Sequence, residues 1–331
     1  MLTKKTFLSL LVILTFSLIS STGCSPGNGA PASSSTVGIY VANGGNSTIT
    51  AYDLSASGDT APARTIGGTN AGFSYMWILT VDAVNKEIIT LDYNANTIKV
   101  FNTSDNGDVA PKRTIAGAST GLDYPTGVAV DTTNNEIIVA NDGNDSVTIF
   151  NRTDSGNVAP VRTISGASTG LADPAGVVLD AANGEIIVAN YKDNSVTVYN
   201  RTDNGDVAAK RTISGASTGL NKPSAIALDT TNGEILVANY GNSSIRVYST
   251  SDDGNVAPLR TISGASTGLG DLWGVAVDST NNEIYATNWG GNTVIVFNRT
   301  DSGDVAPVRT ITGASTNLDG PGGIFVVPVE P

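Results

Sequence analysis

Histidine is absent from this sequence of 331 residues, and cysteine occurs once, as Cys24. Without histidine the chain cannot form a Ser-His-Asp or Cys-His nucleophilic site, a histidine general base, or a histidine-ligated zinc, copper or haem centre. A single cysteine cannot form a disulfide within the chain, so packing must stabilise the fold. Many classes of enzyme are therefore excluded before any motif is considered.

Basic residues are also scarce. The chain has 18 Lys and Arg against 30 Asp and Glu, which gives a formal net charge of -12. This balance disfavours electrostatic binding to nucleic acid or to an anionic lipid surface. Hydrophobic residues make up 40% of the chain, a proportion that indicates a folded protein with a large core. We expect no nucleic-acid partner.

The first residues are typical of an export signal. Two lysines precede an apolar run, residues 7–19, that is too short to span a bilayer comfortably. The segment STGC, residues 21–24, resembles the bacterial lipoprotein signal, although an aliphatic residue is usual at the position of its serine. The resemblance implies a signal peptide over 1–23 and a lipidated Cys24, and residues 24–36 have the composition of a flexible tether. We therefore expect an exported protein anchored to the bacterial cell envelope by lipid alone; the alternative is an ordinary secreted protein with a stray cysteine.

The rest of the chain repeats every 49 residues. Two columns of the repeat show this period: Asp82, Asp131, Asp180, Asp229 and Asp278, and Arg64, Arg113, Arg162, Arg211, Arg260 and Arg309. Within one unit, residues 125–166, four short apolar runs are separated by clusters of Asn, Asp, Gly and Ser. Each run is typical of a strand bounded by turns, and four strands in a repeat of this length indicate a β-propeller blade.

The two ends of the repeat region complement each other. Residues 38–43 match the second strand of the repeat and no first strand precedes them, whereas residues 320–327 match a first strand, after which the chain stops. Each strand type then occurs six times. The sequence predicts an all-β fold over 37–331, a six-bladed β-propeller of four-stranded antiparallel blades, closed where strand 323–327 joins the N-terminal blade, 38–67. We expect a monomer, with the first strands innermost because they are rich in small residues.

The second strands carry a recurrent motif. It reads Tyr-Val-Ala-Asn at residues 40–43 and Ile-Val-Ala-Asn or Leu-Val-Ala-Asn in later repeats, each followed by an alternating strand. This pattern resembles the YVTN-type and NHL-type β-propeller repeats of bacterial cell-surface proteins, and the resemblance covers residues 37–327. It implies the fold but leaves the function open, because such rings host hydrolases, lyases, and carbohydrate- or protein-binding modules.

Aromatic residues break the repeat in two columns. One column lies just before the first strand and the other just after the second strand, and together they hold Trp77, Trp273, Tyr93, Tyr191, Tyr240 and Trp289. In an antiparallel blade both positions lie on the same face of the ring. Aromatic rings with polar edges at the mouth of a channel predict a platform for a glycan, a peptide or a protein. The alternative is that the rings only cover the ends of the innermost strands.

A polar column ends the second strands. It contains Asn43, Asp92, Asn141, Asn190, Asn239 and Asn288. We include Asn141, Asn190, Asn239 and Asn288 in the predicted ligand-binding face, although amides beside turns also hydrogen-bond the neighbouring loop backbone. Asp92 supplies the one charge of the column and is the candidate ligand for calcium, the only cofactor that the pattern suggests.

These features favour a non-enzymatic binding or scaffolding propeller that presents its aromatic face to a ligand at the cell envelope. The alternative is a metal-dependent lactone or ester hydrolase, similar to gluconolactonases, that would hold calcium at Asp92 and the asparagine column. No catalytic residue is predicted. We expect the recurrent arginine of the fourth strands to discourage edge-to-edge association rather than to bind a ligand.

Overall fold

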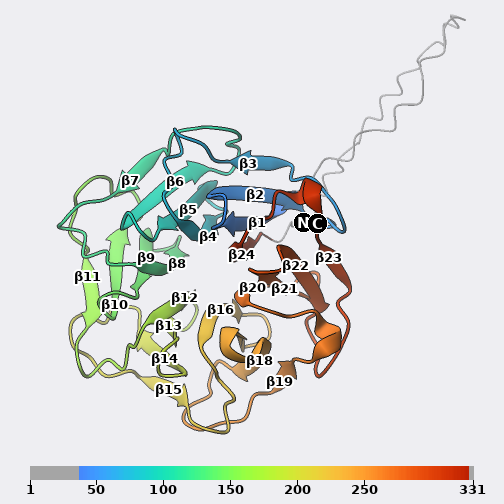
Figure 1. Ribbon diagram of the computed structural model, residues 1–331. Helices are drawn as coiled ribbons and strands as arrows, with labels where there is room; N and C mark the ends of the chain where they lie inside the picture. Colours follow the sequence, from blue (N-terminus) through green and yellow to red (C-terminus); the bar gives the residue numbers. More distant parts are fainter. Residues whose placement is uncertain (1–36, 328–331) are drawn as a thin grey trace, which may run out of the picture. The chain divides into compact units, whose positions relative to one another are not determined.

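The computed structural model describes residues 37–327, which form six four-stranded antiparallel sheets arranged in a ring (Figure 1). The fold class predicted from the repeat is confirmed. The predicted signal peptide 1–23, the lipidated Cys24 and the tether 24–36 lie outside the described residues. No helix in the described part of the chain has the length and apolarity needed to cross a bilayer.

The strands fall into four concentric sets. The innermost strands are β24 (Pro321–Val326), β4 (Met76–Asp82), β8 (Pro125–Asp131), β12 (Pro174–Asp180), β16 (Pro223–Asp229) and β20 (Leu272–Asp278). The second strands are β1 (Val37–Asn43), β5 (Glu87–Asp92), β9 (Glu136–Asn141), β13 (Glu185–Asn190), β17 (Glu234–Asn239) and β21 (Glu283–Asn288). The third strands are β2 (Thr48–Asp53), β6 (Thr97–Asn102), β10 (Ser146–Asn151), β14 (Ser195–Asn200), β18 (Ser244–Ser249) and β22 (Thr293–Asn298). The outermost strands are β3 (Arg64–Ile66), β7 (Arg113–Ile115), β11 (Arg162–Ser165), β15 (Arg211–Ser214), β19 (Arg260–Ile262) and β23 (Arg309–Ile311).

Blade 1 is the sheet β24-β1-β2-β3, and blades 2 to 6 follow in chain order as β4–β7, β8–β11, β12–β15, β16–β19 and β20–β23. Three single 3-10 turns, η1 (Tyr240–Asn242), η2 (Ala265–Thr267) and η3 (Ala314–Thr316), lie in the connecting loops. Tight turns join the strands of a blade, and Asn or Asp supplies the left-handed residue in many of them, as with Asn135 at φ 55° and Asp145 at φ 48° in blade 3. The polar clusters of the sequence therefore mark turns because these residues tolerate positive φ.

The ring closes as the sequence predicts. Strand β24 pairs antiparallel with β1, in the register Ile39 to Val326, Tyr40 to Phe325 and Val41 to Ile324. The predicted bounds 323–327 become Pro321–Val326 in the structure. We call the place where the first and last segments of the ring meet the ring seam. A second contact crosses it, because Gly58 bridges to Ile311 as the equivalent loop glycines do at the other blade junctions. The seam between the ends of the chain is therefore built like the rest of the ring.

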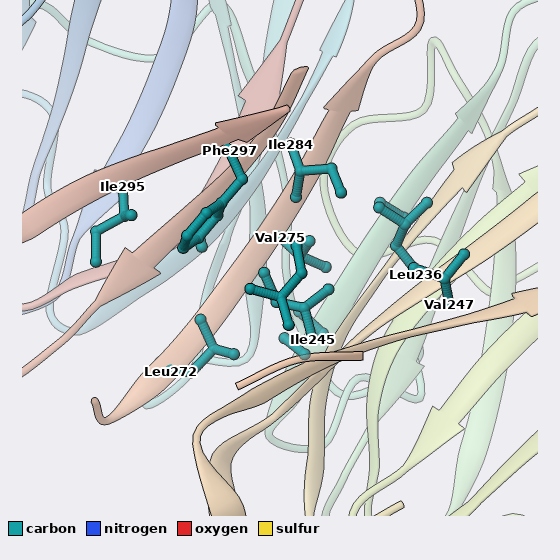
Figure 2. Packing of buried hydrophobic residues seen from close by; sticks show 13 residues of the cluster. Leu236, Ile245, Val247, Leu272, Val275, Ile284, Ile295 and Phe297 are labelled. Atoms are coloured by element: carbon teal, nitrogen blue, oxygen red, sulfur yellow. The ribbon is translucent and has the colours of Figure 1, made fainter. Parts of the chain in front are cut away.

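The core lies between neighbouring blades rather than inside one blade. In the cluster shared by blades 5 and 6, Leu236 and Val247 of one blade pack with Val275, Ile284 and Phe297 of the next (Figure 2). The third strands contribute a further column of fully buried rings, Tyr52, Phe101, Phe150, Tyr199, Tyr248 and Phe297. Because each blade buries its faces on its neighbours, an isolated blade would leave most of this apolar surface in water.

The arginines of the outermost strands have a structural role beyond the one expected. Arg113, Arg162, Arg211, Arg260 and Arg309 each form a two-pronged hydrogen-bonded pair with the glutamate that begins the second strand of the same blade. The Arg113 Nη2 to Glu87 Oε2 distance is 2.7 Å, and Glu87 is buried. Burial raises the pKa of Glu87, but its hydrogen bonds with Arg113 and Lys112 and their positive charges outweigh it and lower that pKa to about 2. The arginine column therefore holds the outermost strand to the body of the blade, a structural role in addition to the expected one.

Some of these pairs extend between blades. Arg152 of blade 3 reaches back to Glu87 of blade 2, with an Nη1 to Oε2 distance of 2.8 Å. Arg201 and Arg299 make the same contact to the glutamates of the blades before theirs, at 3.0 Å. A glutamate with two arginine partners keeps its charge compensated although it is withdrawn from water. Blade 1 lacks the glutamate, since Gly38 stands in its place, and there Arg64 donates to the Tyr40 hydroxyl at 3.3 Å.

Candidate functional site

The predicted aromatic residues gather on one face of the ring. Trp77 and Trp273 are the second residues of the innermost strands β4 and β20, whereas the sequence placed them just before these strands, so each strand begins two residues earlier than expected. Their ring centroids lie 4.8 Å apart, and the Trp77 ring also lies 5.3 Å from Tyr93 and 6.2 Å from Trp289. We define the aromatic cluster as Tyr75, Trp77, Tyr93, Tyr124, Tyr191, Tyr240, Trp273 and Trp289, which ring contacts join into one group.

Glycines in blade 1 allow this cluster to form. Trp77 belongs to blade 2 and Trp273 and Trp289 to blade 6, so their rings meet across the top of the blade between them. In that blade the two aromatic columns hold Gly44 and Gly322. A Cβ at Gly44 would lie 2.4 Å from the Trp289 ring, and a Cβ at Gly322 would lie 2.4 Å from the Trp77 carbonyl oxygen. A larger residue at either position would therefore push the rings or the backbone apart.

A cavity of about 260 Å³ opens beside the aromatic cluster, and we call it the axial pocket. The aromatic residues Trp77, Tyr191 and Trp273 and the acidic residues Asp142 and Asp173 are among those that line it. Ile78 and Gly323 also line a second cavity of about 310 Å³, whose other lining residues are mostly the small and aliphatic ones of the innermost strands, together with Phe325 and Thr230. The axial pocket is therefore the polar and aromatic mouth of an apolar channel along the ring.

Asp142 stands where blades 2, 4, 5 and 6 carry an aromatic residue. It follows the second strand of blade 3, and the Tyr93 hydroxyl donates to its Oδ2 at 3.4 Å. Burial raises the pKa of Asp142, and the negative charges of Asp173, Asp145 and Asp123 raise it further. Burial, followed by the charge of Asp142, also raises the pKa of Tyr93 to about 12. The carboxylate side of the pocket thus concentrates negative charge.

Four members of this face were not singled out by the sequence analysis, namely Tyr75, Tyr124, Asp142 and Asp173. Asp142 lies in the aromatic column that follows the second strands, and a carboxylate among mostly aromatic residues was the sequence feature that could have identified it. Tyr75, Tyr124 and Asp173 share a column two residues before the tryptophan position. That column was overlooked because it lies in the loop that enters the innermost strand, where turn residues are expected to vary.

The asparagine column lies beneath the face rather than on it. Asn141 is fully buried, its Oδ1 accepts a hydrogen bond from the Asp123 backbone N at 3.2 Å, and its Nδ2 donates to Ser146 and Thr148. The same backbone contact recurs one blade at a time for Asn190, Asn239 and Asn288, at 3.2, 2.9 and 3.1 Å. These side chains therefore hold the loops of the aromatic face in place, which is the backbone-anchoring alternative considered for them.

Asp92 does not fit a calcium site. Its carboxylate is fully buried and accepts hydrogen bonds from the Ser74 backbone N at 2.7 Å and the Ser74 hydroxyl at 2.5 Å. The Lys99 ammonium lies 3.1 Å from Oδ2 and supplies the positive charge that a cation would bring. Burial raises the pKa of Asp92, but these hydrogen bonds outweigh it and lower the pKa below its ordinary value. Within residues 37–327, no three or more His, Cys, Asp or Glu side chains are grouped so that they could hold a metal ion.

Comparison with known proteins supports the repeat assignment. Residues 122–150, 171–199 and 220–248 match the family model of the NHL repeat, and each match begins in the loop before an innermost strand and ends in the third strand of a blade. No curated protein matches the chain. Two of the solved structures that share the fold illustrate the likeness. One, from a nidogen/laminin complex, has a TM-score of 0.63 and 17% identity, with 87% of this chain and 97% of that chain covered. The other, a functionally unknown protein from Desulfotomaculum acetoxidans DSM 771, has a TM-score of 0.55 and 16% identity, with coverage of 83% and 80%. The described chain is therefore a six-bladed β-propeller, and blades 3, 4 and 5 carry segments that match the NHL repeat.

Proposed function

We propose that this propeller is a non-catalytic binding module whose glycan, peptide or protein ligand docks on the aromatic face over the axial pocket. The observation that carries the proposal is the gathering of all three tryptophans of the chain into one cluster, of which Trp77 and Trp273 line the axial pocket. Flat rings with polar edges provide large contact area at a small loss of side-chain freedom, which suits recognition. If the chain is exported and lipidated at Cys24, the face serves binding or scaffolding at the cell envelope.

The rings are not needed to build a blade. Blade 3 carries Thr126 and Asp142 at the two aromatic positions and still forms the same four strands as its neighbours. In the other blades the aromatic side chains remain half-buried, and Tyr124 is exposed. A side chain that only sealed the end of a strand would be covered by its own loops. An apolar surface left partly open around a cavity is instead typical of an interaction site.

The structural comparison is consistent with a protein ligand. A propeller of similar fold occurs in a complex of nidogen with laminin. At 17% identity this likeness concerns the fold and not the residues of the site. It supports the proposal only in showing that a ring of this construction can form part of a protein assembly.

An array of glycans and peptides probed with the purified protein tests the proposal. Trp273→Ala and Trp289→Ala should abolish any binding that uses this face, because each removes a ring of the cluster. Val84→Ala is a suitable control, since Val84 is 73% exposed and lies in the loop between strands β4 and β5, at the opposite end of the strands. Binding that survives both tryptophan substitutions would place the ligand elsewhere and refute the proposal.

No observation favours the calcium-dependent hydrolase, since Lys99 already occupies the site that a cation would need at Asp92. A bound cation would stabilise the folded state, so thermal unfolding with and without calcium is informative. We expect the same melting temperature in both conditions. A rise that disappears in Asp92→Asn would restore the hydrolase as the better candidate.

A further inference from the structure

The axial pocket combines two chemical features that each attract positive charge. Its lining includes the aromatic residues Trp77, Trp273 and Tyr191 and the acidic residues Asp142 and Asp173. Aromatic faces attract cations through the negative potential of the ring, most strongly for tryptophan. A carboxylate adds direct electrostatic attraction, which is greater where the site is partly withdrawn from water.

We propose that the axial pocket binds the cationic head of an organic ligand, an alkylammonium or quaternary ammonium group, between the tryptophan rings and the carboxylates of Asp142 and Asp173. This inference rests on the proposed binding function and specifies the chemistry of its ligand. The same head group occurs on free amines and on the basic side chain of a protein partner.

Asp142, one of the two acidic residues that line the pocket, lacks a matching cation. Among the described residues, no lysine or arginine lies within ion-pair distance of Asp142, whose hydrogen-bond partner is the neutral Tyr93 hydroxyl. Lys192 lies 3.7 Å from Asp173, but the two side chains are 64% and 38% exposed, so water screens this pair and it is weak. Burial and the surrounding carboxylates raise the pKa of Asp142, which is the response of an acid without a compensating charge. A bound ammonium group would supply that charge.

The rings of this face already contact an ammonium group of the protein itself. The Lys222 Nζ lies over the Tyr191 ring, 5.7 Å from its centroid. Tyr191 lines the axial pocket, so its ring can accept a cation in the same manner from a ligand. The volume of about 260 Å³ is below the range of roughly 300–1,000 Å³ that is typical of whole drug-sized ligands. The pocket is therefore sized for a head group, while the remainder of the ligand would lie over the open aromatic cluster.

Titration calorimetry with choline and with 3,3-dimethylbutan-1-ol, its neutral analogue of the same shape, tests the proposal. We expect choline to bind at least about tenfold more tightly, and Asp142→Asn and Trp273→Ala each to weaken choline binding by about tenfold, the size of a partly desolvated cation–π or charge contact. Asp142→Asn preserves the shape of the side chain, and unchanged thermal unfolding will show that it folds. Val84→Ala should leave the affinity unchanged. A second arm replaces choline with N-acetyl-lysine amide, and tighter binding of that probe would identify a protein side chain as the source.

Equal binding of the neutral analogue, no binding of either cation, or an undiminished affinity in Asp142→Asn would overturn the cationic ligand. These outcomes differ from failure of the binding function itself. If array ligands still bind through Trp273 and choline does not compete with them, the aromatic face is a binding site for an uncharged ligand such as a glycan.

Discussion

Because the ring is closed by β24, we predict that two Val→Ala substitutions will change the free energy of unfolding by very different amounts. Val326 lies in the closing strand β24 and is 5% exposed, whereas Val84 lies in a loop and is 73% exposed. Val326→Ala and Val84→Ala remove the same two methyl groups. Only the first removes them from the apolar cluster that joins blades 1 and 6, where Val326 packs with Ile39 and Tyr285.

The size of the effect follows from burial. At ~0.8 kcal/mol for each buried carbon, the loss of two methyl groups costs ~1.6 kcal/mol, and the cavity left behind raises this to about 2–3 kcal/mol. The exposed Val84 should change the free energy of unfolding by less than ~0.5 kcal/mol. A chain that ends at Asp319 loses the whole of β24, including its buried Ile324 and Val326. At ~1.5–3 kcal/mol for each side chain, this removes ~3–6 kcal/mol, a large part of the ~5–15 kcal/mol that stabilises an ordinary domain.

Urea unfolding followed by tryptophan fluorescence is the suitable assay. The tryptophans lie beside the seam, since a Cβ at Gly44 of blade 1 would touch the Trp289 ring, so the emission reports on this region of the ring. We expect a lower midpoint for Val326→Ala, an unchanged midpoint for Val84→Ala, and loss of cooperativity with aggregation for the truncated chain because its β1 edge is open. A synthetic peptide of residues 320–327 should partly restore the truncated protein by adding the missing strand. Equal midpoints for the two valine variants, or for the truncated and intact chains, would refute the closed ring.

Further predictions concern charge and backbone packing. The pKa of Glu87 is lowered from 4.5 to about 2, so the stabilisation by its carboxylate is complete above pH 4.5 and is lost as the pH falls through about 2. In a plot of melting temperature against pH, Glu87→Gln should therefore show a smaller fall at acid pH than the unchanged protein. Gly274→Ala would place a Cβ 2.4 Å from a carbonyl oxygen of β24 and should lower the free energy of unfolding by about 1–3 kcal/mol. Gly270→Ala is the control, because a Cβ there would have no atom within 4 Å. Similar free energies of unfolding for both variants would contradict the crowding at Gly274. Asp142→Asn should lower the pKa of Tyr93 from about 12, but not to its ordinary value, because burial is the largest cause of the raised pKa. Ultraviolet titration of the phenol measures this pKa. An unchanged pKa in Asp142→Asn would show that the carboxylate does not act on Tyr93.

Local patterns in the sequence were enough to determine the architecture. Strand and turn signals repeat every 49 residues, and such signals depend on neighbouring residues rather than on distant contacts. The closing strand was also predictable, because residues 320–327 match a first strand and residues 38–43 lack one. Pairing the extra first strand with the blade that lacks one completes that blade and leaves no open sheet edge inside the ring. The pairing of β24 with β1 therefore followed from the count of strands.

The candidate site depended on contacts that the repeat does not encode. The columns predicted which face would carry Trp77, Trp273 and Trp289, but the rings meet only because blade 1, whose residues come from both ends of the chain, places Gly44 and Gly322 between them. The tertiary structure also gave polar side chains at similar positions of the repeat different burial and different hydrogen-bond partners. It buried Asn141, Asn190, Asn239 and Asn288 in hydrogen bonds to the backbone and paired Asp92 with Lys99. It left Asp142 beside an open pocket without a positive partner among the described residues. Burial and partner distance, which arise when distant segments pack together, thus decided which polar residues support the fold and which remain available to a ligand.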